Sequence, residues 1–131
     1  MSPSYFRPKS TNEIANLLCN IAQITPNFPV YYYHIPMMNS VDCNVEKALN
    51  LANNVCPNIV GMKYTGQDFD KYSSAFFKKF NVLVGADNMM VKAFKCGADG
   101  AIGIGYNFAG EWGREIFDAV NQGDMEWAEK N

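Results

Sequence analysis

Two short segments of this chain place a tyrosine and a lysine at the ends of apolar runs. Residues 31–36 read Tyr-Tyr-Tyr-His-Ile-Pro, and residues 61–65 read Gly-Met-Lys-Tyr-Thr. Each segment closes a short apolar run that is typical of a buried strand, so Tyr33 and Lys63 are expected at the C-terminal ends of two strands. A lysine at such a place is hard to explain by packing. A Schiff-base nucleophile beside a tyrosine that carries protons does explain it.

The composition indicates one globular domain and does not favour binding to a strongly charged partner. The chain has 131 residues, of which 48% are hydrophobic and 18% charged, and its net charge is −2. The absence of a basic block argues against nucleic acid or an anionic membrane as the partner. No apolar run approaches the roughly 18 residues of a membrane span. Residues 1–8 lack the apolar core of a signal peptide, so a cytoplasmic location is expected.

The cysteines do not form a metal-binding pattern. They stand at positions 19, 43, 56 and 96 without a Cys-x-x-Cys pair, and His34 is the single histidine of the sequence. A zinc site is therefore not expected. In a cytoplasmic protein the four thiols are expected to be buried and reduced.

Helices and strands alternate along the chain. The pattern predicts strands at 29–33, 58–64, 82–85 and 100–104. Ser10 and Glu13 form a capping box for the first helix, and Asn44 can cap a second helix whose inward residues are Ala48, Leu49, Ala52 and Val55. Residues 65–68 resemble another capping box, which predicts one helix carrying the aromatic residues Phe69, Tyr72, Phe76, Phe77 and Phe80. Three more helices are predicted, one from Asp87 or Asn88 to Gly97, one through Trp112 that Gly123 closes, and one from Met125.

This order of elements predicts an α/β fold with a parallel sheet. One helix is followed by four strand–helix units, and short, continuously apolar strands suit a parallel sheet covered on both faces. A doubly wound sheet and a piece of a (β/α)8 barrel both fit. A full barrel takes roughly 250 residues, so this chain would supply about half of one. In such barrels the C-terminal ends of the strands carry the chemistry.

Four blocks of sequence resemble one family of enzymes. They are residues 31–36, residues 61–65, residues 85–87 (Gly-Ala-Asp) and residues 97–103 (Gly-Ala-Asp-Gly-Ala-Ile-Gly). In order and spacing they are similar to the pyruvate-dependent class I aldolases that include N-acetylneuraminate lyase and dihydrodipicolinate synthase. The resemblance implies that residues 1–131 form one partial domain, the C-terminal half of a TIM (β/α)8 barrel, with strands five through eight. The family's other half carries a loop that binds the substrate carboxylate.

The resemblance also implies an activity and a site. Lys63 would form the Schiff base with the substrate, and Tyr33 would shuttle the proton. Thr65 would contact the sugar acid, while a backbone carbonyl of Gly85 and the carboxylate of Asp87 would bind its hydroxyls. The implied reaction cleaves N-acetylneuraminate to N-acetylmannosamine and pyruvate with no metal or other cofactor. The implied assembly is a homotetramer, and the implied partners are a small sugar acid and pyruvate.

Two positions depart from the family pattern and keep alternatives open. Asn88 stands where the family has a glutamate, so that substrate-binding position loses its charge. Ile104 stands where a serine hydroxyl helps to hold the sugar chain. A related aldolase with another aldehyde partner is therefore an alternative. The length of the chain also keeps open a truncated, non-catalytic half-barrel.

Four residues have structural alternatives. Lys63 could be a lysine that snorkels from a strand end, and Tyr33 an aromatic residue of the barrel core. Thr65 could be the N-cap of the next helix, and His34 a structural side chain on the face opposite to Tyr33.

Overall fold

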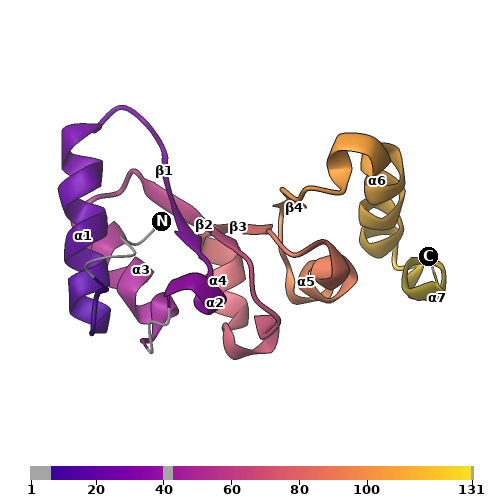
Figure 1. Cartoon of the computed structure of the whole chain (residues 1–131), viewed down its shortest axis with the longest axis horizontal. Coiled ribbons are helices and arrows are strands. Elements are labelled where there is room, and N and C mark those ends of the chain that lie inside the picture. The colour runs from indigo at the N-terminus through magenta and orange to yellow at the C-terminus, as the bar shows by residue number, and fades with distance from the viewer. Residues whose placement is uncertain (1–6, 40–42, 131) are drawn as a thin grey trace. The chain divides into compact units, whose positions relative to one another are not determined.

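The computed structural model describes residues 7–39 and 43–130 of the chain. It divides into two compact units, Met1–Gly66 and Gln67–Asn131. In both units helices alternate with parallel strands (Figure 1). In the described part of the chain, no helix is both long enough and apolar enough to cross a membrane.

The first unit holds one pair of parallel strands and the helix that connects them. Its elements are α1 (Thr11–Ile24), β1 (Val30–His34), α2 (Pro36–Asn39), α3 (Val45–Val55) and β2 (Ile59–Tyr64). β1 pairs with β2 in parallel, with Tyr33 opposite Lys63 and His34 opposite Tyr64. Helices α1 and α3 pack against each other. The short helix α2, which begins at Pro36, was not predicted from the sequence.

Side-chain caps begin both long helices of the first unit, as predicted. The Ser10 hydroxyl accepts a hydrogen bond from the Glu13 amide at 3.2 Å. The Asn44 side chain accepts one from the Lys47 amide at 2.8 Å. These bonds satisfy amides that have no partner within the helix. At the other end of α3, the expectation that Val55 points inward is wrong, because its last-turn position leaves it 66% exposed.

The second unit holds a shorter strand pair and more helices. Its elements are η1 (Phe69–Lys71), α4 (Ser74–Lys79), β3 (Asn81–Val84), η2 (Asp87–Met89), α5 (Met90–Cys96), β4 (Gly100–Ala101), α6 (Tyr106–Gln122) and α7 (Met125–Lys130). β3 pairs with β4 in parallel, with Leu83 opposite Gly100 and Val84 opposite Ala101. β4 has two residues, so the predicted strand at 100–104 was too long.

The single helix predicted after residues 65–68 is wrong. The Asp68 side chain makes no cap hydrogen bond, and only the short 3₁₀ turn η1 follows it. Tyr72 then takes an extended conformation, and Ser73 caps α4 by accepting a hydrogen bond from the Phe76 amide at 3.1 Å. The five aromatic residues of this segment are nevertheless all buried. Ring packing thus buries these residues along two short helices and the extended residues that follow each of them, not along one helix.

Two glycines end helices as predicted. Gly97 closes α5 with φ 105°, and Gly123 closes α6 with φ 82°. Other residues adopt this left-handed conformation at a cost, so glycine is favoured at both places. Helix α6 begins at Tyr106 and is kinked at Ala109.

Candidate active site

Tyr33 and Lys63 lie side by side at the ends of β1 and β2. They are register partners in the parallel pair, and the Lys63 ammonium lies 4.4 Å from the centroid of the Tyr33 ring. Both side chains are half-buried. The amine and the phenol therefore share one face of the strand pair, where a small ligand can reach both.

His34 lies on the opposite face, as the alternation along the strand predicted. Its ring is stacked between those of Tyr32 and Tyr64, with centroid distances of 5.6 and 5.5 Å. All three side chains are buried, and His34 is 2% exposed. This stack of rings supports the strand ends from behind, so His34 is part of the packing.

Thr65 follows Lys63 by two residues and lies directly after the C-terminal end of β2. Its amide donates a hydrogen bond to the His34 carbonyl at 2.9 Å, which extends the pairing of β1 with β2. Its hydroxyl oxygen is buried and makes no hydrogen bond of standard geometry with the described residues. The expectation that Thr65 caps the next helix is wrong, because that helix begins after Ser73. The Thr65 hydroxyl can instead interact with groups on the face of the strand pair that carries Tyr33.

The surroundings of Tyr33 favour its ionised form. The Thr65 hydroxyl, which can donate to a phenolate oxygen, is the main cause that lowers the pKa of Tyr33 below its ordinary value. The Lys63 ammonium lowers that pKa further, and partial burial opposes both effects. A phenol with a lowered pKa gives up its proton more readily and is better suited to carry protons.

In the second unit Asp87 holds the loop that leads into α6. Its carboxylate accepts a hydrogen bond from the Gly105 amide at 2.9 Å. A Cβ on Gly103 would lie 1.5 Å from the other carboxylate oxygen, so only glycine fits there. The family resemblance in the sequence assigned Asp87 to the substrate. The repeated glycines of residues 103–105 were the available signal for this close approach.

The other predicted binding residues, like Asp87, follow the C-terminal end of β3. Gly85 follows the strand directly and is half-buried, and Asn88 is exposed in η2. Ile104, in the loop that Asp87 holds, is 82% exposed. The predicted site residues thus form two groups: Tyr33, Lys63 and Thr65 in the first unit, and Gly85, Asp87 and Asn88 in the second.

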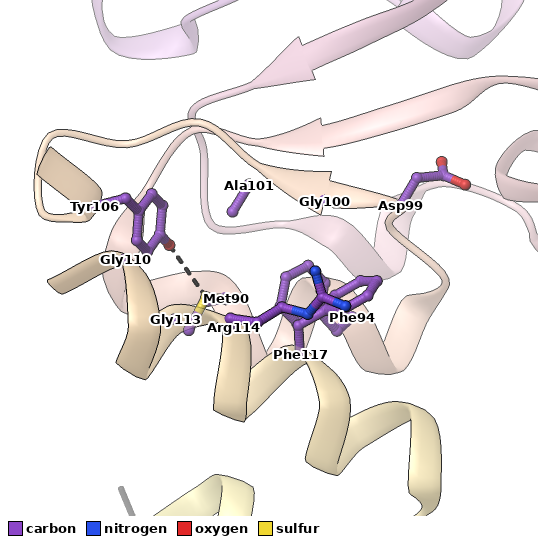
Figure 2. A pocket seen from close by; sticks show the side chains of 10 residues that line it. All are labelled: Met90, Phe94, Asp99, Gly100, Ala101, Tyr106, Gly110, Gly113, Arg114 and Phe117. Atoms are coloured by element: carbon purple, nitrogen blue, oxygen red, sulfur yellow. Dashed lines mark hydrogen bonds between the residues drawn. The ribbon is translucent and has the colours of Figure 1, made fainter.

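A cavity of about 310 Å³ in the second unit contains none of the predicted site residues. Figure 2 shows it between α5, β4 and α6, with Phe94 and Phe117 packed edge to face at 4.8 Å. The Tyr106 hydroxyl donates to the Met90 sulfur at 3.2 Å across its lining. Apolar side chains make up most of this lining, and Arg114 and Asp99 supply its charges. The cavity has no nucleophile with a neighbouring base, so it does not compete with Lys63 as a reactive site.

Metal ligands do not gather in the described ranges 7–39 and 43–130. No group of three or more histidine, cysteine or acidic side chains there could hold a metal ion. The reactive groups at the ends of β1 and β2 are an amine and a phenol.

The comparison with known families decides where this chain belongs. The model of the dihydrodipicolinate synthetase family matches residues 1–131. The chain belongs to the dihydrodipicolinate synthetase family. Curated relatives include the N-acetylneuraminate lyases of Gallus gallus and Danio rerio, which are 32% and 31% identical to it. The matches cover 99% and 95% of this chain and 44% and 42% of the relatives. The chain thus spans less than half the length of the relatives it matches.

Solved structures of the family have the same fold over this region. The N-acetylneuraminate lyase (sialic acid aldolase) of Aliivibrio salmonicida superposes with a TM-score of 0.86 at 31% identity, covering 98% of this chain and 44% of that one. The dihydrodipicolinate synthase of Aquifex aeolicus gives a TM-score of 0.78 at 27% identity, covering 92% and 41%. The predicted fold class is confirmed: the chain is the C-terminal half of a (β/α)8 barrel, in which parallel strands alternate with helices.

Proposed function

We propose that this chain carries the Schiff-base half of a class I, pyruvate-dependent aldolase. The Tyr33–Lys63 pair is the observation that carries the proposal, because it sets an amine beside a phenol at neighbouring strand ends. Membership of the dihydrodipicolinate synthetase family supports it. In this chemistry the covalent link to Lys63 replaces a metal or other cofactor as the electron sink.

The proposed reaction proceeds through an iminium ion on Lys63. The neutral amine attacks the ketone carbon of the sugar acid, and loss of water gives the iminium ion. Tyr33 accepts the proton of the hydroxyl on carbon four while the bond between carbons three and four breaks. The bond electrons pass into an enamine, the aldehyde leaves, and protonation and hydrolysis of the enamine release pyruvate. Thr65 stabilises the Tyr33 phenolate by donating its hydroxyl hydrogen.

The proposed substrate is N-acetylneuraminate, which would give N-acetylmannosamine and pyruvate. The names of the relatives with 28–32% identity support this choice. Gly85, Asp87 and Asn88 are the proposed contacts for the sugar chain. We further propose that residues 1–131 act as one partial barrel domain, that activity needs a complete barrel, and that the complete protein is a cytoplasmic homotetramer.

A second candidate is a related pyruvate aldolase with another aldehyde partner. Asn88 and Ile104 favour it, since both are exposed beside Asp87 and neither supplies the charge or hydroxyl of the family pattern. Their chemistry suits an aldehyde with fewer hydroxyl groups. The Schiff-base step on Lys63 is common to both candidates.

Trapping with borohydride tests the Schiff base itself. The chain, joined to the N-terminal half of the Gallus gallus relative to complete a barrel, is incubated with pyruvate and reduced, and its peptides are analysed by mass spectrometry. We expect one reduced pyruvyl group on Lys63, and none in a Lys63→Met variant. Lys71→Met is the matched control, because the Lys71 ammonium also lies over a tyrosine ring, that of Tyr72 at 5.3 Å. Labelling that persists in Lys63→Met would overturn the proposal.

A further inference from the structure

Two thiols come together where α1 packs against α3. The proposed aldolase reaction uses neither of them. Cys19 lies on α1, and Cys56 is the C-cap residue of α3. The Cys56 thiol donates a hydrogen bond to the Cys19 carbonyl at 3.9 Å, and the Cys19 thiol donates one to the Ala52 carbonyl at 3.7 Å. Each sulfur therefore points to the backbone of the opposite helix, and the packing of the two helices brings the thiols together.

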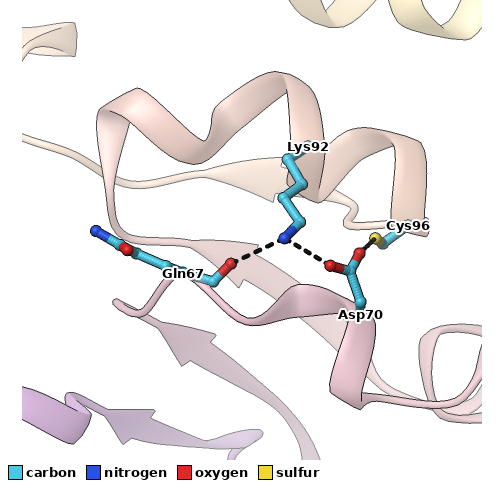
Figure 3. A network of polar contacts seen from close by, with 4 residues as sticks. All are labelled: Gln67, Asp70, Lys92 and Cys96. Atoms are coloured by element: carbon cyan, nitrogen blue, oxygen red, sulfur yellow. Dashed lines mark hydrogen bonds and ion pairs between the residues drawn. The ribbon is translucent and has the colours of Figure 1, made fainter.

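The four cysteines are all reduced in the structure, yet their surroundings differ. Cys56 is buried and Cys19 is half-buried. Burial raises the pKa of the Cys19 thiol, and the neighbouring Cys56 thiol raises it further. Cys96, by contrast, donates to the Asp70 carboxylate at 3.6 Å, and Figure 3 shows that carboxylate shared with Lys92. Cys96 thus has an acidic neighbour, whereas Cys19 has a second thiol.

We propose that Cys19 and Cys56 form a redox-sensitive pair that hydroperoxides oxidise to a disulfide. The thiolate of Cys19, the more exposed residue, attacks a peroxide oxygen and breaks the O–O bond. This gives a sulfenic acid and one molecule of water when the peroxide is hydrogen peroxide. The Cys56 thiolate then attacks the Cys19 sulfur, breaks the S–O bond and releases a second water. The two thiols lose two electrons and two protons, and the peroxide is reduced to two waters.

The fold is prepared for this crosslink. The Asn58 side-chain amide already donates to the Ala22 and Thr25 carbonyls at 3.1 and 3.0 Å, which ties α1 to the start of β2. The disulfide would link the same part of the fold, since Cys19 lies three residues before Ala22 on α1 and Cys56 lies two residues before Asn58. Closing a loop between positions 37 apart in the sequence restricts the unfolded chain and stabilises the folded one. Because only thiolates react, oxidation is expected to be slow at neutral pH and faster in alkaline solution.

Peptide mapping of the whole chain after hydrogen peroxide treatment tests this inference. Unreacted thiols are blocked with N-ethylmaleimide before digestion without a reducing agent. We expect an intramolecular Cys19–Cys56 peptide, blocked Cys43 and Cys96, and full reversal by dithiothreitol. The crosslinked chain is expected to melt at least about 5 °C higher than the reduced chain.

Three serine variants control the assignment. Cys43→Ser should still form the crosslink, while Cys19→Ser and Cys56→Ser should each abolish it and leave the remaining thiol open to blocking. A crosslink in another pair would overturn the proposal, and so would further oxidation of Cys19 without a crosslink. Mapping the unsubstituted chain decides the matter even if a serine variant fails to fold.

Discussion

The Lys63 ammonium lies 4.4 Å from the centroid of the Tyr33 ring, and the two residues are paired across parallel strands. The pairing fixes their relative height, since neighbouring parallel strands run about 4.8 Å apart. The buried stack of Tyr32, His34 and Tyr64 supports the same strand ends from the other face. An amine and a phenol are thus held together by packing, which is the arrangement that a Schiff-base reaction with proton transfer needs.

Replacing Tyr33 by phenylalanine removes the proton carrier and leaves the nucleophile. In the completed barrel, Tyr33→Phe should slow cleavage of N-acetylneuraminate by roughly 10²–10⁴-fold, the usual contribution of a positioned acid–base group. Borohydride should still trap pyruvate on Lys63, but more slowly. Tyr31→Phe is the matched control, because the exposed ring of Tyr31 is not expected to carry the proton. Unchanged turnover in Tyr33→Phe would show that Tyr33 only packs.

The lowered pKa of Tyr33 gives a prediction that does not depend on activity. A lowered pKa means that the Tyr33 phenolate forms at a lower pH than the usual value of about 10. Because the Thr65 hydroxyl is the main cause, Thr65→Val should move the pKa of Tyr33 back toward its ordinary value, and Lys63→Met should do so to a smaller extent. Ultraviolet absorbance of the phenolate measures the titration.

Tyr106 provides the internal reference for this titration. Burial, together with the negative charge of Asp87, raises the pKa of Tyr106. Tyr33 should therefore ionise before Tyr106 as the pH rises, and Tyr33→Phe should remove the earlier step alone. If Thr65→Val leaves that earlier step at the same pH, the hydroxyl does not stabilise the phenolate.

Because Asp87 holds the loop that leads into α6, alanine substitutions at Gly103 and Gly110 should affect stability differently. Gly103→Ala would put a Cβ 1.5 Å from the Asp87 carboxylate, so the loop must shift, at a cost of about 1–3 kcal/mol in the free energy of unfolding. Gly110→Ala, on α6, meets no atom within 4 Å and should be neutral or stabilising by about 0.4–1 kcal/mol. Urea unfolding measures both. Equal stability of the two variants would contradict the close approach seen here.

The sequence predicted those features that neighbouring residues determine. Ser10 and Asn44 cap helices, and Gly97 and Gly123 end them, because each effect acts within a few residues along the chain. The strands that end near Tyr33 and Lys63 were predicted for the same reason. Short apolar runs bounded by prolines and glycines are a local signal.

The misses have tertiary causes. Helical spacing of five aromatic residues suggested one helix, but ring packing buries them equally well across the break at Ser73. The Gly105 amide donates a hydrogen bond to the Asp87 carboxylate across eighteen positions. The glycines at 103 and 105 indicate a close approach there but not the residue that makes it. The Cys19–Cys56 proximity likewise depends on how α1 packs against α3. Spacing along the chain carries no information on these approaches.

The departures at Asn88 and Ile104 predict an effect on substrate affinity. The completed barrel should have a higher KM for N-acetylneuraminate than its double variant Asn88→Glu, Ile104→Ser. Each restored hydrogen bond contributes about 0.5–1.5 kcal/mol, so the variant should lower KM by roughly 5- to 150-fold. Steady-state kinetics with a coupled pyruvate assay measures the change. Trapping of pyruvate on Lys63 should stay the same in both proteins, and an unchanged KM would mean that neither position contacts the sugar chain.

The isolated chain is expected to self-associate and to show little or no lyase activity. Phe108 and Trp112 are exposed on either side of the kink at Ala109 in α6, and Ile104 is exposed just before that helix. Exposed apolar side chains gathered in one segment favour association in water.

Size-exclusion chromatography of the 131 residues should therefore give a species larger than a monomer. Changing Phe108 and Trp112 together to glutamate should shift it toward the monomer. The matched control is Phe28→Glu, because Phe28 is also exposed but lies in the first unit. The control should leave the association unchanged. Supplying the N-terminal half of a relative's barrel should restore pyruvate production. A monomeric chain that is active without that half would show that the 131 residues complete a working site on their own.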